Sequence, residues 1–264
     1  MSASSATAGF NEDELVEKPS IAVLANLGWR TASGSGETFG ARGSLGRETR
    51  SDVTLSVTLR QSLARLNADL PAEALEAALQ ELTRDRAAMG FVAANRELWT
   101  LMRDGVPVSV ADATRESSLR TERVRVIDWN TVEANDFLLV SQLTIAGTLY
   151  TCRPDLIGFV NGLPWVVIEL KKPGVPAKQA FDGNLTSYKH THNGVPQLFW
   201  SNALLIASNG TDTRRGSSSR SMRFHSKKRS QSAVSEPTRL SVPFEAISSA
   251  LLQKSCGTPL CVCL

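Results

Sequence analysis

The sequence is poor in several features that mark specialised classes of protein. It has four cysteines, three histidines and two tyrosines in 264 residues. Cys152 is the single cysteine before residue 256, which argues against a disulfide scaffold and suits a reducing, cytoplasmic location. The other three, Cys256, Cys261 and Cys263, lack the spacing of a zinc site.

Long apolar runs and nucleotide-binding motifs are also missing. No stretch of about 18 apolar residues occurs, so we expect no membrane-spanning helix and no membrane partner. Residues 1–9 lack the basic and apolar regions of a secretory signal. No G-x-x-x-x-G-K-[ST] motif is present, which excludes a P-loop ATPase motor from this chain. Apolar residues make up 42% and charged residues 21%, as in ordinary globular proteins.

The formal net charge of +3 hides an uneven distribution. Residues 211–264 contain nine basic and three acidic residues, a net of +6, which leaves 20 basic and 23 acidic residues, a net of −3, for residues 1–210. The basic excess is therefore no sign of a DNA-binding body. Residues 211–235 are rich in Ser, Arg and Lys and are expected to be disordered.

The order of apolar patterns predicts an α/β fold. Asn11 and Glu14 form a capping-box pattern for a first helix, in which Pro19 is either a kink or the true start. A Gly/Ser-rich segment, 31–50, is typical of a mobile loop, and 52–63 could begin a strand or a helix. The remaining expectations are helices at 71–82 and 87–102, several strands within 122–171, a helix within 176–190 and a last strand at 204–206.

The most informative segment is 153–171, where two apolar runs flank Asn161-Gly162. This dipeptide is the strongest short signal for a β-hairpin. A loop of two to four residues makes the numbers of paired residues sum to 323–325, so that Asp155 faces a position between 168 and 170. Asp155 and Glu169 then lie side by side on antiparallel strands, with Cβ atoms roughly 5 Å apart.

Two neighbouring carboxylates repel each other unless a cation neutralises them, and Mg²⁺ is the natural cation for oxygen ligands. Glu169 and Lys171 share a strand face, whereas the Leu170 side chain points into the core and only its carbonyl could reach a metal. A metal, two acids and an ammonium are the components of phosphodiester hydrolysis. A surface ion pair is the plain alternative, but charges at the end of a buried strand pair are unusual without a partner.

These residues form a sequence pattern that resembles the PD-(D/E)xK nuclease motif. In particular, the chain resembles the N-terminal domain of the restriction subunit of type I restriction–modification enzymes. The likeness runs from about residue 12 to 210. It rests on Pro154-Asp155, Asn161-Gly162-Leu163-Pro164 and Glu169-Leu170-Lys171, together with 14–17, 27–29, 46–50, 95–96, 104–106 and 208–210.

The resemblance implies a restriction-endonuclease-like core, a central mixed β-sheet flanked by helices, which cuts double-stranded DNA with Mg²⁺. Asp155 and Glu169 would hold the metal and Lys171 would be the catalytic lysine. Glu17 would match an additional acid of related nucleases, or else face solvent. The Gln-x-x-x-Tyr motif of the family would correspond to Asn184 and Tyr188, with an Asn one methylene shorter than Gln.

The resemblance also sets the expected organisation. Residues 1–10 would be disordered, 11–210 would form the nuclease domain with a catalytic core at about 122–210, and 211–264 would be a disordered, non-native tail on a truncated gene. The full family subunit of the bacterial cytoplasm adds an ATP-driven translocase and works with modification and specificity subunits, and this chain has no ATP site.

Two other functions remain open from sequence. The chain could be a non-catalytic remnant or assembly module that binds DNA or partner subunits without cutting, although its Asp155, Glu169 and Lys171 are intact. It could also be a RecB-like repair nuclease with the same active site, which the N-terminal motifs disfavour.

Overall fold

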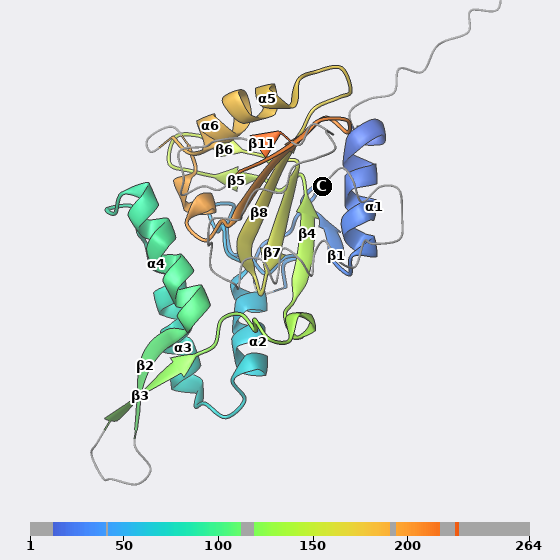
Figure 1. Cartoon of the computed structure of the whole chain (residues 1–264). Coiled ribbons are helices and arrows are strands. Elements are labelled where there is room, and N and C mark those ends of the chain that lie inside the picture. Colours follow the sequence, from blue (N-terminus) through green and yellow to red (C-terminus); the bar gives the residue numbers. More distant parts are fainter. Residues whose placement is uncertain (1–12, 41, 112–118, 191–193, 217–224, 227–264) are drawn as a thin grey trace, which may run out of the picture.

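The computed structural model describes residues 13–40, 42–111, 119–190, 194–216 and 225–226, and it is an α/β protein built on one main sheet (Figure 1). The predicted fold class is confirmed. The sheet has the order β1-β4-β7-β8-β9-β10, with a short β11 beside β10. These strands are β1 (Arg30–Ser33), β4 (Phe137–Ser141), β7 (Leu156–Val160), β8 (Leu163–Leu170), β9 (Leu204–Ser208), β10 (Thr213–Gly216) and β11 (His225–Ser226).

The sheet is mixed. β1 runs parallel to β4 and β8 runs parallel to β9, while β4, β7 and β8 form an antiparallel meander and β10 is antiparallel to β9. Every residue of β7 and β8 is buried, which explains why both strands are apolar runs without alternation. The central hairpin is therefore covered on both of its faces.

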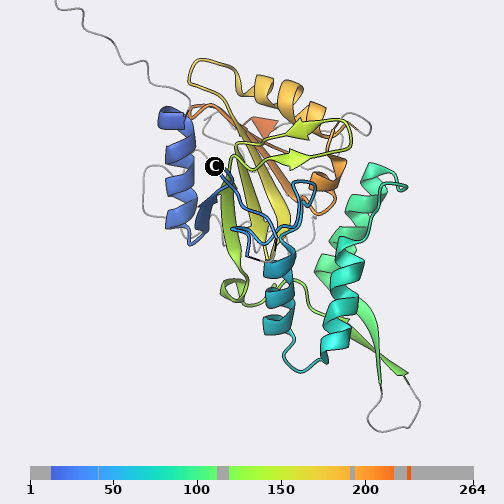
Figure 2. The same ribbon diagram turned by 180° about the vertical axis from the view of Figure 1, so that it is seen from behind.

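Helices cover the two faces of the sheet, and the sheet separates two apolar clusters (Figures 1 and 2). The first cluster joins η1 (Asp13–Glu17), α1 (Lys18–Asn26) and the helices α2, α3 and α4, which lie within 56–104, to one face. The second cluster lies on the other face of the sheet. It packs against that face a helical segment, which consists of α5 (Ala177–Gln179), η3 (Ala180–Leu185) and α6 (Thr186–Tyr188), and the short helix η4 (Pro196–Phe199). A small hairpin of β5 (Ile145–Ala146) and β6 (Thr151–Cys152) precedes β7.

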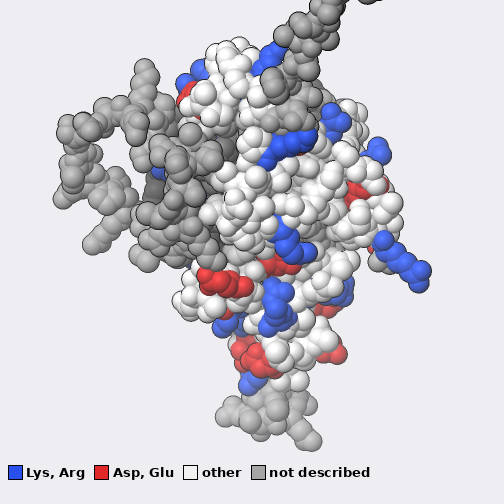
Figure 3. Space-filling model, turned by 90° about the vertical axis from the view of Figure 1, so that its right-hand side faces the viewer, with Lys and Arg blue, Asp and Glu red and all other residues white. Residues whose placement is uncertain are grey.

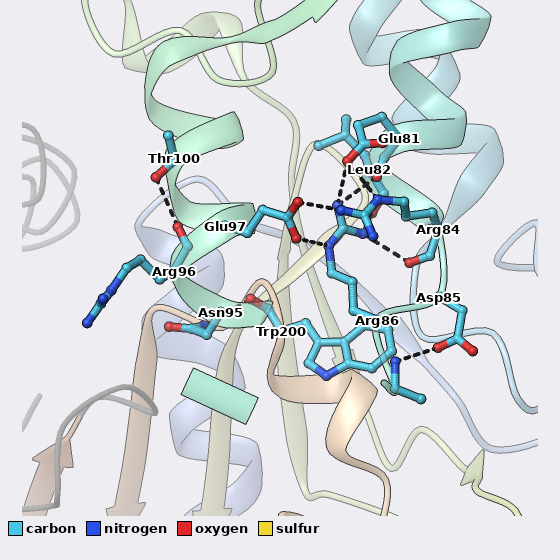
Figure 4. A network of polar contacts seen from close by, with 11 residues as sticks. Glu81, Leu82, Arg84, Asp85, Arg86, Asn95, Arg96, Glu97, Thr100 and Trp200 are labelled. Carbon is cyan, nitrogen blue, oxygen red and sulfur yellow. Dashed lines mark hydrogen bonds and ion pairs between the residues drawn. The ribbon is translucent and has the colours of Figure 1, made fainter. Parts of the chain in front are cut away.

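A helical insertion between β1 and β4 extends away from the sheet (Figures 1 and 2). It consists of α2 (Ser56–Leu66), α3 (Ala72–Thr83), α4 (Phe91–Asp104) and the hairpin of β2 (Val106–Ala111) and β3 (Leu119–Val124), followed by η2 (Val132–Ala134). The side chain of Arg86 is fully buried between α3 and α4 and forms ion pairs of 3.1 Å with both Glu81 and Glu97 (Figure 4). This network fastens the two helices together.

Several expectations about elements are settled by the structure. Pro19 lies in the first turn of α1, directly after the π-helical turn η1, so the change from π-helix to α-helix falls beside this proline. The ambiguous segment 52–63 is helical from Ser56 onward, where α2 begins, and the two helices expected at 71–82 and 87–102 are α3 and α4. Asn11 of the proposed capping box lies outside the described residues.

The Gly/Ser-rich segment 31–50 differs from its expected form. Its first residues are strand β1, and the loop that follows is tied to a buried arginine. Arg47 donates from Nε to Glu37 Oε1 at 2.8 Å, from Nη1 to the carbonyl of Asp52 at 2.8 Å and from Nη2 to the carbonyl of Thr144 at 2.9 Å. Because the guanidinium is completely buried, these bonds hold the loop against the β4–β5 connection.

The expected disorder from residue 211 onward is wrong for residues 213–216. They form β10, whose Thr213 pairs with Ser208 and whose Gly216 pairs with Leu205. The Asn209-Gly210 turn, with Gly210 at φ 83°, therefore connects two strands rather than ending the fold. The Arg-rich composition of this strand is typical of solvated segments, so the sequence pattern did not indicate it. Residues 217–224 and 227–264 lie outside the described part of the chain.

Candidate active site

The hairpin of β7 and β8 forms as its sequence predicts. Val160 pairs with Leu163 across the turn, and both turn residues have positive φ, 50° at Asn161 and 85° at Gly162. Leu156 pairs with Ile168, a sum of 324 that lies within the predicted register, with one shift between Gly158 and Phe159. Continuing this register by one residue sets Asp155 opposite Glu169.

Asp155 lies just before β7 and is partly exposed. Its Oδ2 accepts a hydrogen bond from the backbone N–H of Leu170 at 2.7 Å, which ties its carboxylate to the end of β8. The side chain of Leu170 is buried in the apolar core, as the strand alternation predicts.

Glu169 is fully buried at the end of β8. Its Oε2 accepts a hydrogen bond from Asn184 Nδ2 at 2.8 Å, and the Tyr188 hydroxyl also hydrogen-bonds the carboxylate. Its Oε1 has no hydrogen-bond partner among the described residues. Burial and the nearby charge of Asp155 raise the pKa of Glu169 to about 8, against the smaller opposing effects of the two hydrogen bonds and of Lys171.

Lys171 follows β8 and is partly exposed, so its ammonium can reach solvent or a ligand. Its backbone N–H donates to the carbonyl of Ser208 at 2.8 Å, which continues the parallel pairing with β9 for one more residue. The positive charge of Lys171 lowers the pKa of Glu169, so the two side chains act on each other.

Asn184 and Tyr188 come from the helical segment after the lysine, one from η3 and one from α6. Their four-residue spacing sets them on one face, and both reach Glu169. Tyr188 is buried, and this burial together with the charge of Glu169 raises the pKa of its hydroxyl, which stays a donor. The one-methylene deficit of Asn184 relative to Gln does not prevent contact.

Glu17 lies at the start of the first helix and is 8% exposed, so the alternative of a solvent-facing charge is wrong. Its Oε2 accepts a hydrogen bond at 2.7 Å from Nε2 of Gln142, which also donates to Asp155 Oδ1 at 3.3 Å. Sequence reasoning missed Gln142. The available signal was weak: a polar residue that follows Ser141, the last residue of β4.

The donor set fits a hard divalent cation. Two carboxylates, Asp155 and Glu169, meet at one strand end, and Glu169 has a buried oxygen without a partner. Within the described residues no three His, Cys, Asp or Glu side chains cluster as a ready metal cage. Mg²⁺ is suited to such a partial set, because it keeps several water ligands and binds through one or two carboxylates.

The surface beside α1 gives no separate indication of a ligand. Lys and Arg side chains are interspersed there with Asp and Glu and with uncharged residues, without a continuous basic patch (Figure 3). The candidate active site is therefore the place where β7 begins and β8 ends, in the middle of the mixed sheet, with two acids and a lysine together.

Comparison with known proteins gives the family. Residues 9–223 match the family described as the type I restriction enzyme R protein N terminus, and the chain belongs to this family. The match includes β10, which the sequence-based boundary at residue 210 left out.

Curated relatives agree with the family match. The chain is 34% identical over 212 residues to the type I restriction enzyme HindI endonuclease subunit of Haemophilus influenzae, an alignment that covers 79% of this chain and 19% of the relative. It is 27% identical over 215 residues to the putative type I restriction enzyme MjaIXP endonuclease subunit of Methanocaldococcus jannaschii, covering 80% and 20%. The chain thus spans about a fifth of the length of these relatives.

No described helix is long and apolar enough to cross a membrane.

Proposed function

We propose that this chain is a Mg²⁺-dependent endonuclease domain that hydrolyses DNA phosphodiester bonds. The observation that carries the proposal is Glu169, a fully buried carboxylate with one unpartnered oxygen, beside Asp155 and Lys171 at the end of one hairpin. A purely structural role leaves that buried oxygen unexplained, because buried polar atoms are normally paired.

Each residue has a distinct part in the proposed reaction. Asp155, Glu169 and the carbonyl of Leu170 would hold the cation, which would polarise the phosphate and lower the pKa of a water. Lys171 provides a compact positive charge to a phosphate oxygen or to the attacking water. Asn184 and Tyr188 donate to Glu169 and hold its carboxylate in place. Glu17 is an additional acid at the edge of the site.

The proposed substrate is double-stranded DNA, held through its backbone. The relatives are named as endonuclease subunits of type I restriction enzymes. We therefore propose that the domain works in the cytoplasm within an assembly containing modification and specificity subunits, and that ATP is used elsewhere in that assembly. We expect this chain alone to show weak, unspecific nicking and no DNA-dependent ATP hydrolysis.

The decisive experiment incubates supercoiled plasmid with the full chain and Mg²⁺, and follows conversion to nicked circles on a gel. Lys171→Ala should abolish nicking, whereas Lys172→Ala, a change at the neighbouring exposed lysine, should leave it within a few-fold of the wild type. Plasmid that stays intact with the wild-type chain at every Mg²⁺ concentration would overturn the proposal and favour a non-catalytic binding module.

A further inference from the structure

Gln142 has an unusual backbone at the end of β4. Its φ is 53°, in the left-handed region that residues other than Gly, Asn and Asp rarely adopt. Its N–H donates to the carbonyl of Asp155 at 2.8 Å, which fixes the two chain segments side by side. Strained residues of this kind gather at functional sites, where the surrounding structure maintains them.

The backbone on the other side of Gln142 is equally constrained. Gly34 donates its N–H to the carbonyl of Ser141 at 2.7 Å. A Cβ at Gly34 would lie 2.6 Å from the Cα of Leu143 and 3.0 Å from the carbonyl oxygen of Gln142, so only glycine allows this approach. The turn is thus held from both sides and directs the Gln142 side chain toward the carboxylates.

The side chain of Gln142 bridges two acids with one nitrogen. Nε2 carries two hydrogens and lies 2.7 Å from Glu17 Oε2 and 3.3 Å from Asp155 Oδ1. Since Asp155 Oδ2 already accepts from the Leu170 N–H, both oxygens of that carboxylate have a donor. A neutral amide suits this place, because a carboxylate would repel both acids and a lysine would compete with a cation.

We propose that Gln142 is a positioning residue of the site: it orients Asp155 and Glu17 for cation binding without adding charge. The inference rests on the proposed nuclease function. Groups that orient metal ligands from outside typically contribute about 10–100-fold to metal affinity. Loss of the amide should therefore weaken Mg²⁺ binding more than it slows cutting at saturating Mg²⁺.

The test compares Gln142→Asn with Gln142→Leu in the full chain. Asn tolerates the left-handed backbone but is one methylene shorter, and Leu has similar size without donors. Both should raise the Mg²⁺ concentration for half-maximal nicking, and the calorimetric Mg²⁺ dissociation constant, by about tenfold. The nicking rate at saturating Mg²⁺ should stay within a few-fold of the wild type for both variants. The thermal unfolding midpoint of the metal-free Asn variant should equal that of the wild type.

Failure of the proposed Gln142 role can be told apart from failure of the nuclease function on which it rests. If the wild type nicks DNA and both variants bind Mg²⁺ with unchanged affinity, Gln142 has no positioning role while the nuclease proposal stands. If the wild type neither binds Mg²⁺ in calorimetry nor nicks, both are overturned. Should Gln142→Leu fail to fold, Gln142→Asn alone decides, since its backbone preference is retained.

Discussion

Asn184 donates its side-chain amide to Glu169 Oε2 at 2.8 Å, from a helical turn to the end of a strand 15 residues earlier in the chain. The contact explains how a residue shorter than glutamine can serve at this position. The donor stabilises the ionised form of a carboxylate whose burial favours the neutral form.

Replacement of Asn184 should shift the pH dependence of Mg²⁺ binding. In Asn184→Ala the pKa of Glu169, already about 8, should rise further because a hydrogen bond to its charged form is lost. The midpoint of Mg²⁺ binding against pH, measured by calorimetry, should move to higher pH by about half a unit or more. Asp182→Asn, an exposed change on the same helical segment, is the control and should leave the midpoint unchanged. An identical profile for Asn184→Ala and wild type would contradict this role.

The buried Glu169 should make metal-free stability fall with rising pH. Its pKa is raised from 4.5 to about 8 in the fold, so between these values the folded chain retains a proton that the unfolded chain has lost. The stabilisation is complete below pH 4.5 and is lost as the pH rises through 8. Glu169→Gln removes this titration.

Thermal unfolding in EDTA between pH 5 and pH 8.5 measures the effect. The midpoint of the wild type should fall by several degrees more than that of Glu169→Gln, at about 2–4 °C per kcal/mol for a domain of this size. Mg²⁺ should restore stability at pH 8 in the wild type only. Parallel curves for the two proteins would show that Glu169 is ionised throughout.

Arg47 should be essential for stability although it lies in a glycine-rich loop. Its side chain is fully buried and paired with Glu37, which is 4% exposed. Arg47→Ala leaves a buried carboxylate without its partner and should cost about 3–5 kcal/mol. Arg60→Ala removes an exposed pair with Glu76 and should cost less than about 1 kcal/mol. Urea unfolding of both variants makes the comparison, and equal effects would disprove the buried anchor.

Asn161 should stabilise the fold through the hydrogen bonds of its side chain more than through its positive φ in the turn. Its Oδ1 accepts from the N–H of Asp136 at 2.7 Å, and its Nδ2 donates to the carbonyl of Val126 and to Asn135 Oδ1, each at 2.8 Å. Asn161→Gly keeps the positive φ but leaves these buried groups unpaired, at a cost of about 3 kcal/mol or more. Asn130→Gly, at an exposed asparagine, should cost less than about 1 kcal/mol in the same urea experiment. A neutral Asn161→Gly would show that the turn alone sets the hairpin.

Features that depend on short-range interactions could be predicted from the sequence, and features that depend on long-range packing could not. The hairpin and its register could be predicted because the Asn161-Gly162 turn and the flanking apolar runs act within 15 residues. Strand β10 could not, because its pairing with β9 overrides an Arg-rich composition that is typical of solvated segments.

The sequence by itself determined the mixed α/β class, the family resemblance and the pair of Asp155 and Glu169, since local pairing brings these two residues together. The tertiary structure alone decided that Glu17 is buried, that Gln142 bridges it to Asp155 and that Asn184 reaches Glu169. Glu17 and Gln142 are 125 residues apart in the chain. No local pattern encodes such a contact, because it depends on how helix, strand end and sheet pack together.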